Sequence, residues 1–152
     1  MNSVKSGLLL WFNFVLPALL PFMITINLLK ATPFPLILSK ILSPITNKLF
    51  GLSNFGIFSL VSGMISGYPI GAKIVSELYS ERKLSKNEAQ YLLSFANNSG
   101  PLFIIGTIGT GLLDNKNIGF FLLLIHYLSA LIIGIIQPKQ KTKITKLNTS
   151  LE

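Results

Sequence analysis

Long stretches without a charged residue alternate with short polar segments along the whole chain. Each of the four longest reaches the roughly 20 residues that a helix needs to cross a hydrocarbon core about 30 Å thick. They are 6–29, 49–72, 89–113 and 117–138. The pattern predicts an all-α integral membrane protein, built as a helical bundle with several membrane-embedded segments.

The polar positions divide this bundle into elements. Between 36 and 50, Lys40 and Lys48 recur at helical spacing among apolar residues, which is typical of an amphipathic helix lying in the membrane interface. Three regions are predicted: a short N-terminal tail at 1–6, a membrane domain at 7–137 and a basic, disordered tail at 138–152. Within the membrane domain we expect spans at about 7–29 and 117–137, an interfacial helix at about 36–50, a re-entrant hairpin at about 52–83 and a broken helix at about 86–113.

Two breaks rich in glycine and proline interrupt the apolar stretches, at 66–69 and 97–101. Backbone irregularity is costly in hydrocarbon and persists where protein or a polar cavity covers it. Pro69 and Pro101 each precede an apolar helical stretch, and proline is favoured at the first position of a helix. Both breaks therefore predict helix N-termini at membrane depth, where free amides and the helix dipole attract anions. Paired breaks of this kind are typical of a transporter's solute site.

Candidate solute-binding residues follow from these breaks. Lys73 lies one turn after Pro69 and adds a positive charge; the alternatives are that it pairs with Glu77 at i+4 or extends to a lipid headgroup. A second alternative is that Gly63, Gly67 and Gly71 form a close-packing stripe between membrane helices. The candidates are Ser66, Gly67, Tyr68, Pro69, Lys73, Asn97, Asn98, Ser99, Gly100 and Pro101.

Two topologies remain open for the second stretch. If all four stretches cross the membrane, nine basic residues lie inside and four outside. If 52–83 is instead a re-entrant hairpin, ten lie inside and two outside, with Lys73 within the membrane. The excess of basic residues on cytoplasmic segments favours the hairpin.

The composition of the chain excludes several classes of function. The net charge of +8 comes from basic residues scattered between apolar runs, which indicates topology signals and lipid contacts rather than a nucleic-acid surface. The chain has no cysteine, one histidine and five acidic residues, so we expect no metal site, no cofactor and no enzyme activity. His126, near the middle of the last span, is a candidate for proton coupling; the alternative is a neutral imidazole that donates to a neighbouring carbonyl.

The acidic residues indicate local helix structure. Ser85-Lys86-Asn87-Glu88 has the spacing of a capping box, which predicts a helix start at about Lys86. Glu77, Glu81 and Glu88 are expected to be exposed charges on helices.

Several motifs together resemble the YlbJ family of sporulation integral membrane proteins, which belongs to the nucleoside-recognition or Gate domain group. The resemblance covers roughly residues 7–136 and the N-terminal half of that family. The motifs are Leu16-Pro17-Ala18-Leu19-Leu20-Pro21-Phe22, Ser66-Gly67-Tyr68-Pro69-Ile70-Gly71-Ala72-Lys73, Phe95-Ala96-Asn97-Asn98-Ser99-Gly100-Pro101-Leu102-Phe103-Ile104 and His126-Tyr127.

The resemblance implies a multi-pass protein of the membrane around the forespore in a spore-forming bacterium. It also implies one half of a transporter-like two-repeat fold, with dipicolinic acid as the leading solute. We therefore expect as partners the lipid bilayer, a small anionic or polar solute, and a second copy or a missing C-terminal half; we expect no nucleic acid. The alternatives are a non-transporting scaffold or sensor of a sporulation complex, and half of a nucleoside-type transporter.

Overall fold

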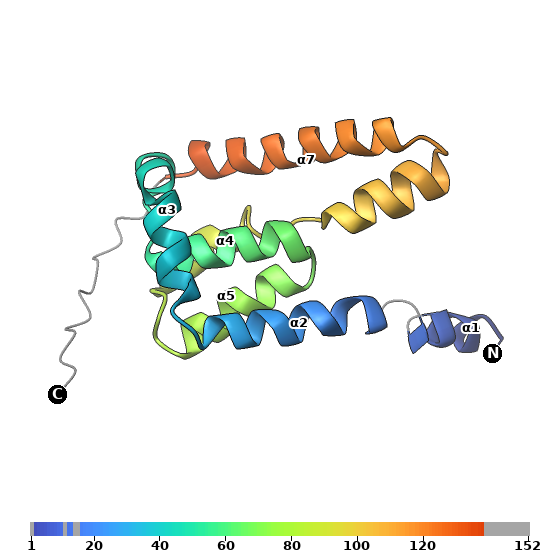
Figure 1. Cartoon of the computed structure of the whole chain (residues 1–152), viewed down its shortest axis with the longest axis horizontal. Coiled ribbons are helices and arrows are strands. Elements are labelled where there is room, and N and C mark those ends of the chain that lie inside the picture. The colour runs from blue at the N-terminus through green and yellow to red at the C-terminus, as the bar shows by residue number, and fades with distance from the viewer. Residues whose placement is uncertain (1, 11, 14–15, 139–152) are drawn as a thin grey trace.

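The computed structural model describes residues 2–10, 12–13 and 16–138, and every regular element in this part of the chain is a helix. The predicted all-α class is confirmed, whereas the tail predicted at 138–152 lies outside the described residues beyond Pro138. The elements are α1 (Asn2–Leu10), α2 (Leu16–Lys30), α3 (Phe34–Leu49), α4 (Asn54–Ser66), α5 (Ile70–Ser80), α6 (Lys86–Leu93), the π-helix η2 (Leu102–Leu112) and α7 (Lys116–Ile136) (Figure 1).

α7 runs along the length of the molecule (Figure 1). Among the described residues it is the one helix that is by itself long and apolar enough to cross a membrane. Its 21 residues correspond to a length of about 30 Å, the thickness of a hydrocarbon core. Asn115 caps its start, because the Asn115 side chain accepts hydrogen bonds from the amides of Asn117 and Ile118. α7 covers the region where the sequence predicts the last span.

The N-terminal region is divided. Where the sequence predicts one span at about 7–29, the structure has the two helices α1 and α2. α2 has 15 residues, fewer than the roughly 20 of a full span, and continues through Pro21. From Met23 to Lys30 it makes an angle of 87° with α3.

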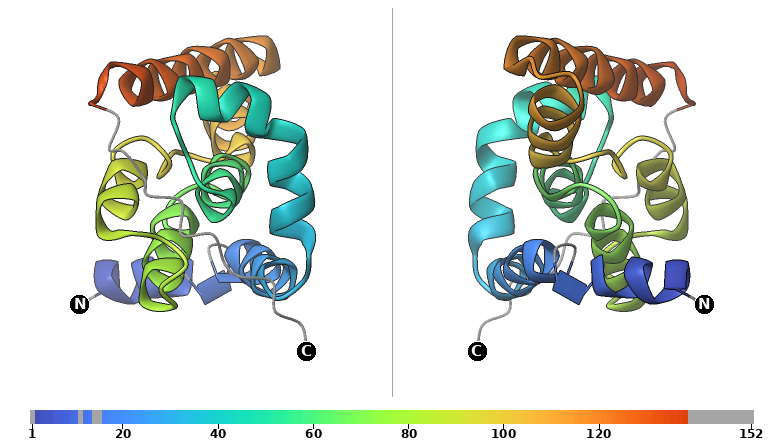
Figure 2. Two further views of the ribbon diagram at one scale, coloured as in Figure 1. Left: turned by 90° about the vertical axis from the view of Figure 1, so that its left-hand side faces the viewer. Right: turned by 90° about the vertical axis from the view of Figure 1, so that its right-hand side faces the viewer.

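α3 therefore lies across one end of the bundle, and Figure 2 shows it bending on its way. Pro44 lies inside this 16-residue helix and removes one backbone hydrogen bond, which explains a bend. Ser39 and Thr46 are buried against the bundle, whereas Lys40 and Ile41 are exposed. A helix at right angles to its neighbour, with apolar and basic residues exposed, has the shape predicted for the interfacial helix at 36–50.

α4 and α5 form a tight helical hairpin. Ser53 caps α4 by accepting a hydrogen bond from the Gly56 amide, at 3.1 Å. The most buried apolar side chains come from α4, α5 and α6, and they include Ile57, Phe58, Ile74 and Leu92. The core therefore lies between the hairpin and α6.

The second broken element consists of α6, an irregular segment and η2. α6 ends at Leu93, three residues before the end predicted at about Ala96, and regular structure resumes only at Leu102. η2 then packs along α7. A Cβ placed on Gly109 would lie 2.5 Å from the Cα of Gly119, so the two backbones are in close contact there.

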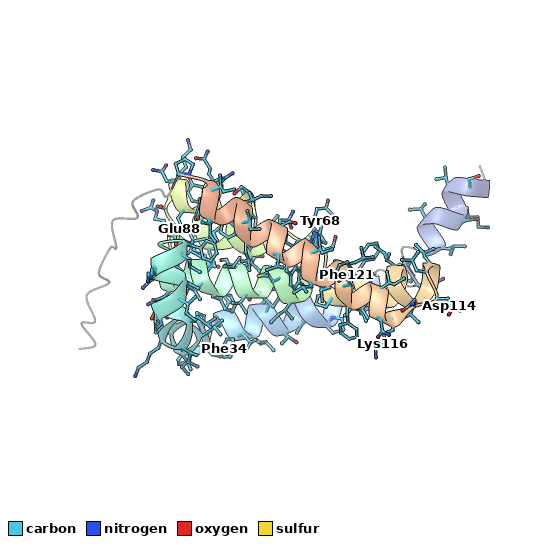
Figure 3. All side chains as sticks on the ribbon, turned by 90° about the horizontal axis from the view of Figure 1, so that it is seen from above. Phe34, Tyr68, Glu88, Asp114, Lys116 and Phe121 are labelled. Carbon is cyan, nitrogen blue, oxygen red and sulfur yellow. The ribbon has the colours of Figure 1, made fainter. Side chains whose placement is uncertain are left out.

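The two ends of the bundle differ in charge. Figure 3 shows Phe34 and Glu88 at one end, Asp114 and Lys116 at the other, and Tyr68 between them. We call the end formed by α3, the end of α2 and the α5–α6 connection the lysine-rich end. Its basic residues are Lys30, Lys40, Lys48, Arg82, Lys83 and Lys86.

Candidate functional site: a crossing of two interrupted segments

The first break has a backbone that glycine alone tolerates well. α4 ends at Ser66, and Gly67 has φ 79° and ψ −175°. This region of backbone space is essentially restricted to glycine. Tyr68–Pro69 is a cis peptide bond, and α5 begins at Ile70. The chain thus reverses direction within three residues, as the glycine and proline pattern predicts.

The second break is a segment without regular structure, held by its own side chains. Asn98 is buried, and its Nδ2 donates a hydrogen bond of 2.6 Å to the carbonyl of Phe95. Pro101 then caps η2 with φ −58° and ψ −38°, close to helical values. Proline therefore precedes the new helix at both breaks, one position before the place predicted.

The structure brings the two breaks into direct contact. The Tyr68 amide donates a hydrogen bond of 2.6 Å to the carbonyl of Asn98, and the Ala72 amide donates one of 3.3 Å to Oδ1 of Asn97. We call the contact between 63–72 and 96–100 the crossing. Sequence analysis predicts both breaks, and the structure shows that the second break supplies the acceptors for two backbone amides of the first arm.

Glycines make this contact possible. A Cβ on Gly63 would lie 2.1 Å from the carbonyl oxygen of Ala96, and one on Gly71 would lie 2.7 Å from the same atom. A Cβ on Gly67 would lie 2.4 Å from the amide nitrogen of Gly100. The glycines at intervals of four do pack closely, as the alternative interpretation proposed. They lie on both arms of an interrupted hairpin rather than along one helix.

α7 holds both arms of the crossing through two consecutive residues. Nε2 of His126 accepts a hydrogen bond of 3.1 Å from the Ser99 amide, and the Tyr127 hydroxyl donates to the carbonyl of Met64. Nε2 of His126 is therefore an acceptor in this contact, and a bond donated to a carbonyl would have to come from Nδ1. Tyr127 was not singled out from the sequence, although it follows His126 in the recognised motif. His126 is the central residue of α7, so the crossing lies at the level of the middle of this helix.

The crossing leaves hydrogen-bond donors available. The amides of Asn97, Asn98 and Gly100 donate to no acceptor among the described residues. Tyr68 is 69% exposed, and Ser99 is half-buried. Ser66, Asn97 and Pro101 are also half-buried, and Pro69 is exposed.

The backbone amides at the start of α5 are less available to an anion than the sequence implies. The amides of Ile70 and Gly71 donate to the carbonyl of Gly67, and the Ala72 amide is taken by Asn97. An anion at this helix start would have to displace these partners. The free donors belong instead to the second break.

Lys73 belongs to an ion-pair network on α5. Lys73 and Lys30 both donate to Glu77, and Lys30 also donates to Glu81 at 2.6 Å. The alternative pairing of Lys73 with Glu77 is therefore present. Hydrogen bonds from Lys30 and Lys83 lower the pKa of Glu81, so its ion pairs persist at neutral pH. Their contribution to stability is lost as the pH falls below the ordinary range of a glutamate.

We expect Lys30→Gln to weaken the attachment of α2 to α5. The loss should be about 1 kcal/mol or less, because the pairs are partly exposed, and it should shrink as salt screens the charges. The measurement is detergent-induced unfolding followed by circular dichroism at low and high salt. Lys40→Gln, on the exposed side of α3, is the matched control. Equal effects of the two substitutions at low salt would contradict this role.

Glu88 is a correction to the sequence analysis. It was expected to be exposed, yet it is 2% exposed. Ser85 does cap α6 by accepting from the Glu88 amide, at 3.1 Å, as the capping box predicts. The Glu88 carboxylate does not return to Ser85, because its Oε1 accepts a hydrogen bond of 2.6 Å from the Ser53 amide. It thereby links the starts of α6 and α4 across 35 residues.

In the described part of the chain, no group of three or more His, Cys, Asp or Glu residues is placed so that it could hold a metal ion. The polar groups of the crossing are amides, hydroxyls and carboxamides. This set can bind a solute through hydrogen bonds.

Comparison with known proteins gives a relative. No protein family model and no solved structure matches the chain. The chain is 39% identical over 134 residues to the sporulation integral membrane protein YlbJ of Bacillus subtilis (strain 168). The match covers 88% of this chain and 33% of YlbJ, so the chain spans about a third of the length of that relative. The resemblance that the motifs indicated is confirmed: the chain is a relative of the integral membrane protein YlbJ and corresponds to one third of it.

Proposed function

We propose that the chain is part of a membrane transporter for a small organic anion in spore formation, and that the crossing forms part of the solute path. One observation carries the proposal: two interrupted segments meet at the level of the middle of α7, with unpaired backbone donors at the contact. Interrupted helices at mid-membrane depth are the usual place of the solute site in secondary transporters.

The membrane placement follows from α7. With α7 crossing the bilayer, His126 lies about 15 Å from each end of the helix, half the thickness of the hydrocarbon core. The hairpin of α4 and α5 then enters and leaves on the lysine-rich side (Figure 1). Six described basic residues lie at that end, against Lys5 and Lys116 at the opposite end. This charge distribution supports a cytoplasmic position for the lysine-rich side in the proposal.

The chemistry of the crossing favours a solute rich in acceptors. Its available groups are the three unpaired amides, the Tyr68 hydroxyl and the Asn97 Nδ2. Backbone amides and hydroxyls bind carboxylate oxygens well. Dipicolinate, a small aromatic dicarboxylate, is therefore the first solute to test, and the exposed ring of Tyr68 offers an aromatic surface to it.

The proposed solute path needs further protein on the side of the crossing that this chain leaves uncovered. A backbone amide without a hydrogen-bond partner in hydrocarbon costs a free energy on the order of several kcal/mol. The three amides are therefore not expected to face lipid alone. The chain spans a third of its relative. A second copy of the chain, or a segment corresponding to another part of the relative, completes the site in this proposal.

Uptake into proteoliposomes tests the proposal, with dipicolinate and a nucleoside compared. We expect dipicolinate uptake that falls about tenfold in Tyr68→Ala, equivalent to about 1.4 kcal/mol of lost solute binding. Tyr79→Ala, an exposed tyrosine on the far end of the same hairpin, should retain uptake. Equal losses in both variants would place the solute path elsewhere.

The second candidate function is a scaffold or sensor in a sporulation complex. The observation that favours it is the tight backbone packing between Gly67 and Gly100, which stabilises a rigid crossing. A chain that inserts normally but moves neither solute would support the scaffold. Nucleoside uptake in place of dipicolinate would instead identify a nucleoside-type transporter half.

A further inference from the structure

We propose that His126 is a proton-operated latch on the second break: the neutral imidazole holds the Ser99 amide, and protonation at Nε2 releases it. The latch itself follows from the contact between α7 and the segment 96–100. Its effect on solute movement rests on the proposed function.

The latch depends on the lone pair of Nε2 in the His126 ring, which can accept either the Ser99 N–H or a proton. Nε2 of His126 accepts the Ser99 N–H at 3.1 Å, so this nitrogen is unprotonated and the ring proton is on Nδ1. A proton that binds Nε2 occupies the same lone pair. The imidazolium then has donors at both nitrogens, and the N–H of Ser99 faces another N–H. The hydrogen bond between α7 and the break is lost, and no other bond changes.

Release affects one arm of the crossing. Tyr127 still holds the hairpin through its hydroxyl bond to Met64, because a tyrosine hydroxyl is protonated throughout the range in which histidine changes charge. The bonds from Tyr68 to Asn98 and from Ala72 to Asn97 still hold the start of the second segment. The part set free is therefore Ser99 and the residues that lead into η2.

The surroundings make His126 the group that responds to pH here. The elements around it, α4, the segment 94–101 and η2, contain no titratable side chain. The other ionisable side chains at the crossing are Tyr127 on α7 and Tyr68 at the hairpin tip. Lys73, on α5, is paired with Glu77. A pH-dependent change in the crossing would thus report the charge of His126.

Electron paramagnetic resonance of one nitroxide label can test the latch without any solute. The chain has no cysteine, so a label on Leu102→Cys is unique. Leu102 is 69% exposed and begins η2 directly after the break. In the full chain in lipid nanodiscs, we expect the label to be more mobile at about pH 5 than at about pH 8, because a proton on Nε2 removes the acceptor of the Ser99 amide. A label on Leu112→Cys, at the far end of η2, should be unaffected.

Two substitutions of His126 separate the latch from simple packing. In His126→Gln a side-chain oxygen still accepts from Ser99 and cannot be protonated in this range, so the label at Leu102→Cys should be restricted at both pH values. In His126→Phe the acceptor is lost, and the label should be mobile at both. An unchanged spectrum of the unsubstituted chain between the two pH values, or an equal change in His126→Gln, would overturn the proposal. Neither result depends on whether the chain transports dipicolinate.

Discussion

Gly67→Ala should destabilise the protein by a few kcal/mol and separate the two arms of the crossing. Its backbone, at φ 79° and ψ −175°, costs about 1–3 kcal/mol for any residue with a Cβ. The new methyl group would also lie 2.4 Å from the nitrogen and 2.7 Å from the Cα of Gly100. These are backbone atoms that cannot rotate away, and overpacking of this kind costs about another 1–3 kcal/mol. Detergent-induced unfolding monitored by circular dichroism measures the loss.

Gly106→Ala is the matched control for Gly67→Ala. Both substitutions add one methyl group and restrict the unfolded chain equally. The atom nearest to a Cβ on Gly106 is Cδ1 of Leu102, at 3.8 Å, so the control should be neutral or slightly stabilising. If both variants unfold together with the parent chain, close packing of the crossing does not contribute to stability.

Glu88→Ala should be the second most damaging substitution, although Glu88 lies at the lysine-rich end, far from the crossing. It removes the acceptor of the Ser53 amide and leaves a buried donor unpaired, which costs about 1–3 kcal/mol. It also leaves an empty volume beside Gly56, whose Cβ position lies 2.3 Å from Oε1 of Glu88. Because Glu88 fixes the start of α6 against the start of α4, hydrogen exchange of the Ser53 region should rise as well.

Glu88→Gln tests which property of Glu88 matters. Its side-chain oxygen can still accept from Ser53, so it should lose much less stability than Glu88→Ala. Asn87→Ala, at the exposed neighbouring position, controls for a general effect on the first turn of α6. Equal unfolding of Glu88→Gln and Glu88→Ala would mean that charge, rather than the hydrogen bond, is the important property.

The two breaks could be predicted because their cause is local. Glycine at φ above zero and proline before a helix depend on a few neighbouring residues, which the sequence displays directly. The helices at 34–49 and 116–136 follow from periodicity and length in the same way. Local chemistry also placed Ser85 correctly as the cap of α6.

The remaining features depend on partners distant in the sequence. The burial of Glu88 is set by Ser53, and the role of His126 is set by Ser99, 27 residues away. A capping-box spacing cannot show that its glutamate will turn to another helix. The partners of Glu77 include Lys30, 47 residues away, which only the tertiary fold brings near. These contacts determine which donors of the candidate site stay free.

We propose that α3, at 87° to the end of α2, lies flat in the membrane interface and so fixes a reference level for the whole protein. A helix lying flat among lipid headgroups keeps its level when the bilayer becomes thinner or thicker, whereas a spanning helix adapts by tilting. The hairpin and α6 both start beside α3. Changes in lipid chain length should therefore be absorbed on the opposite leaflet, around the turn at Asp114, while the depth of the crossing below the headgroups near α3 stays constant.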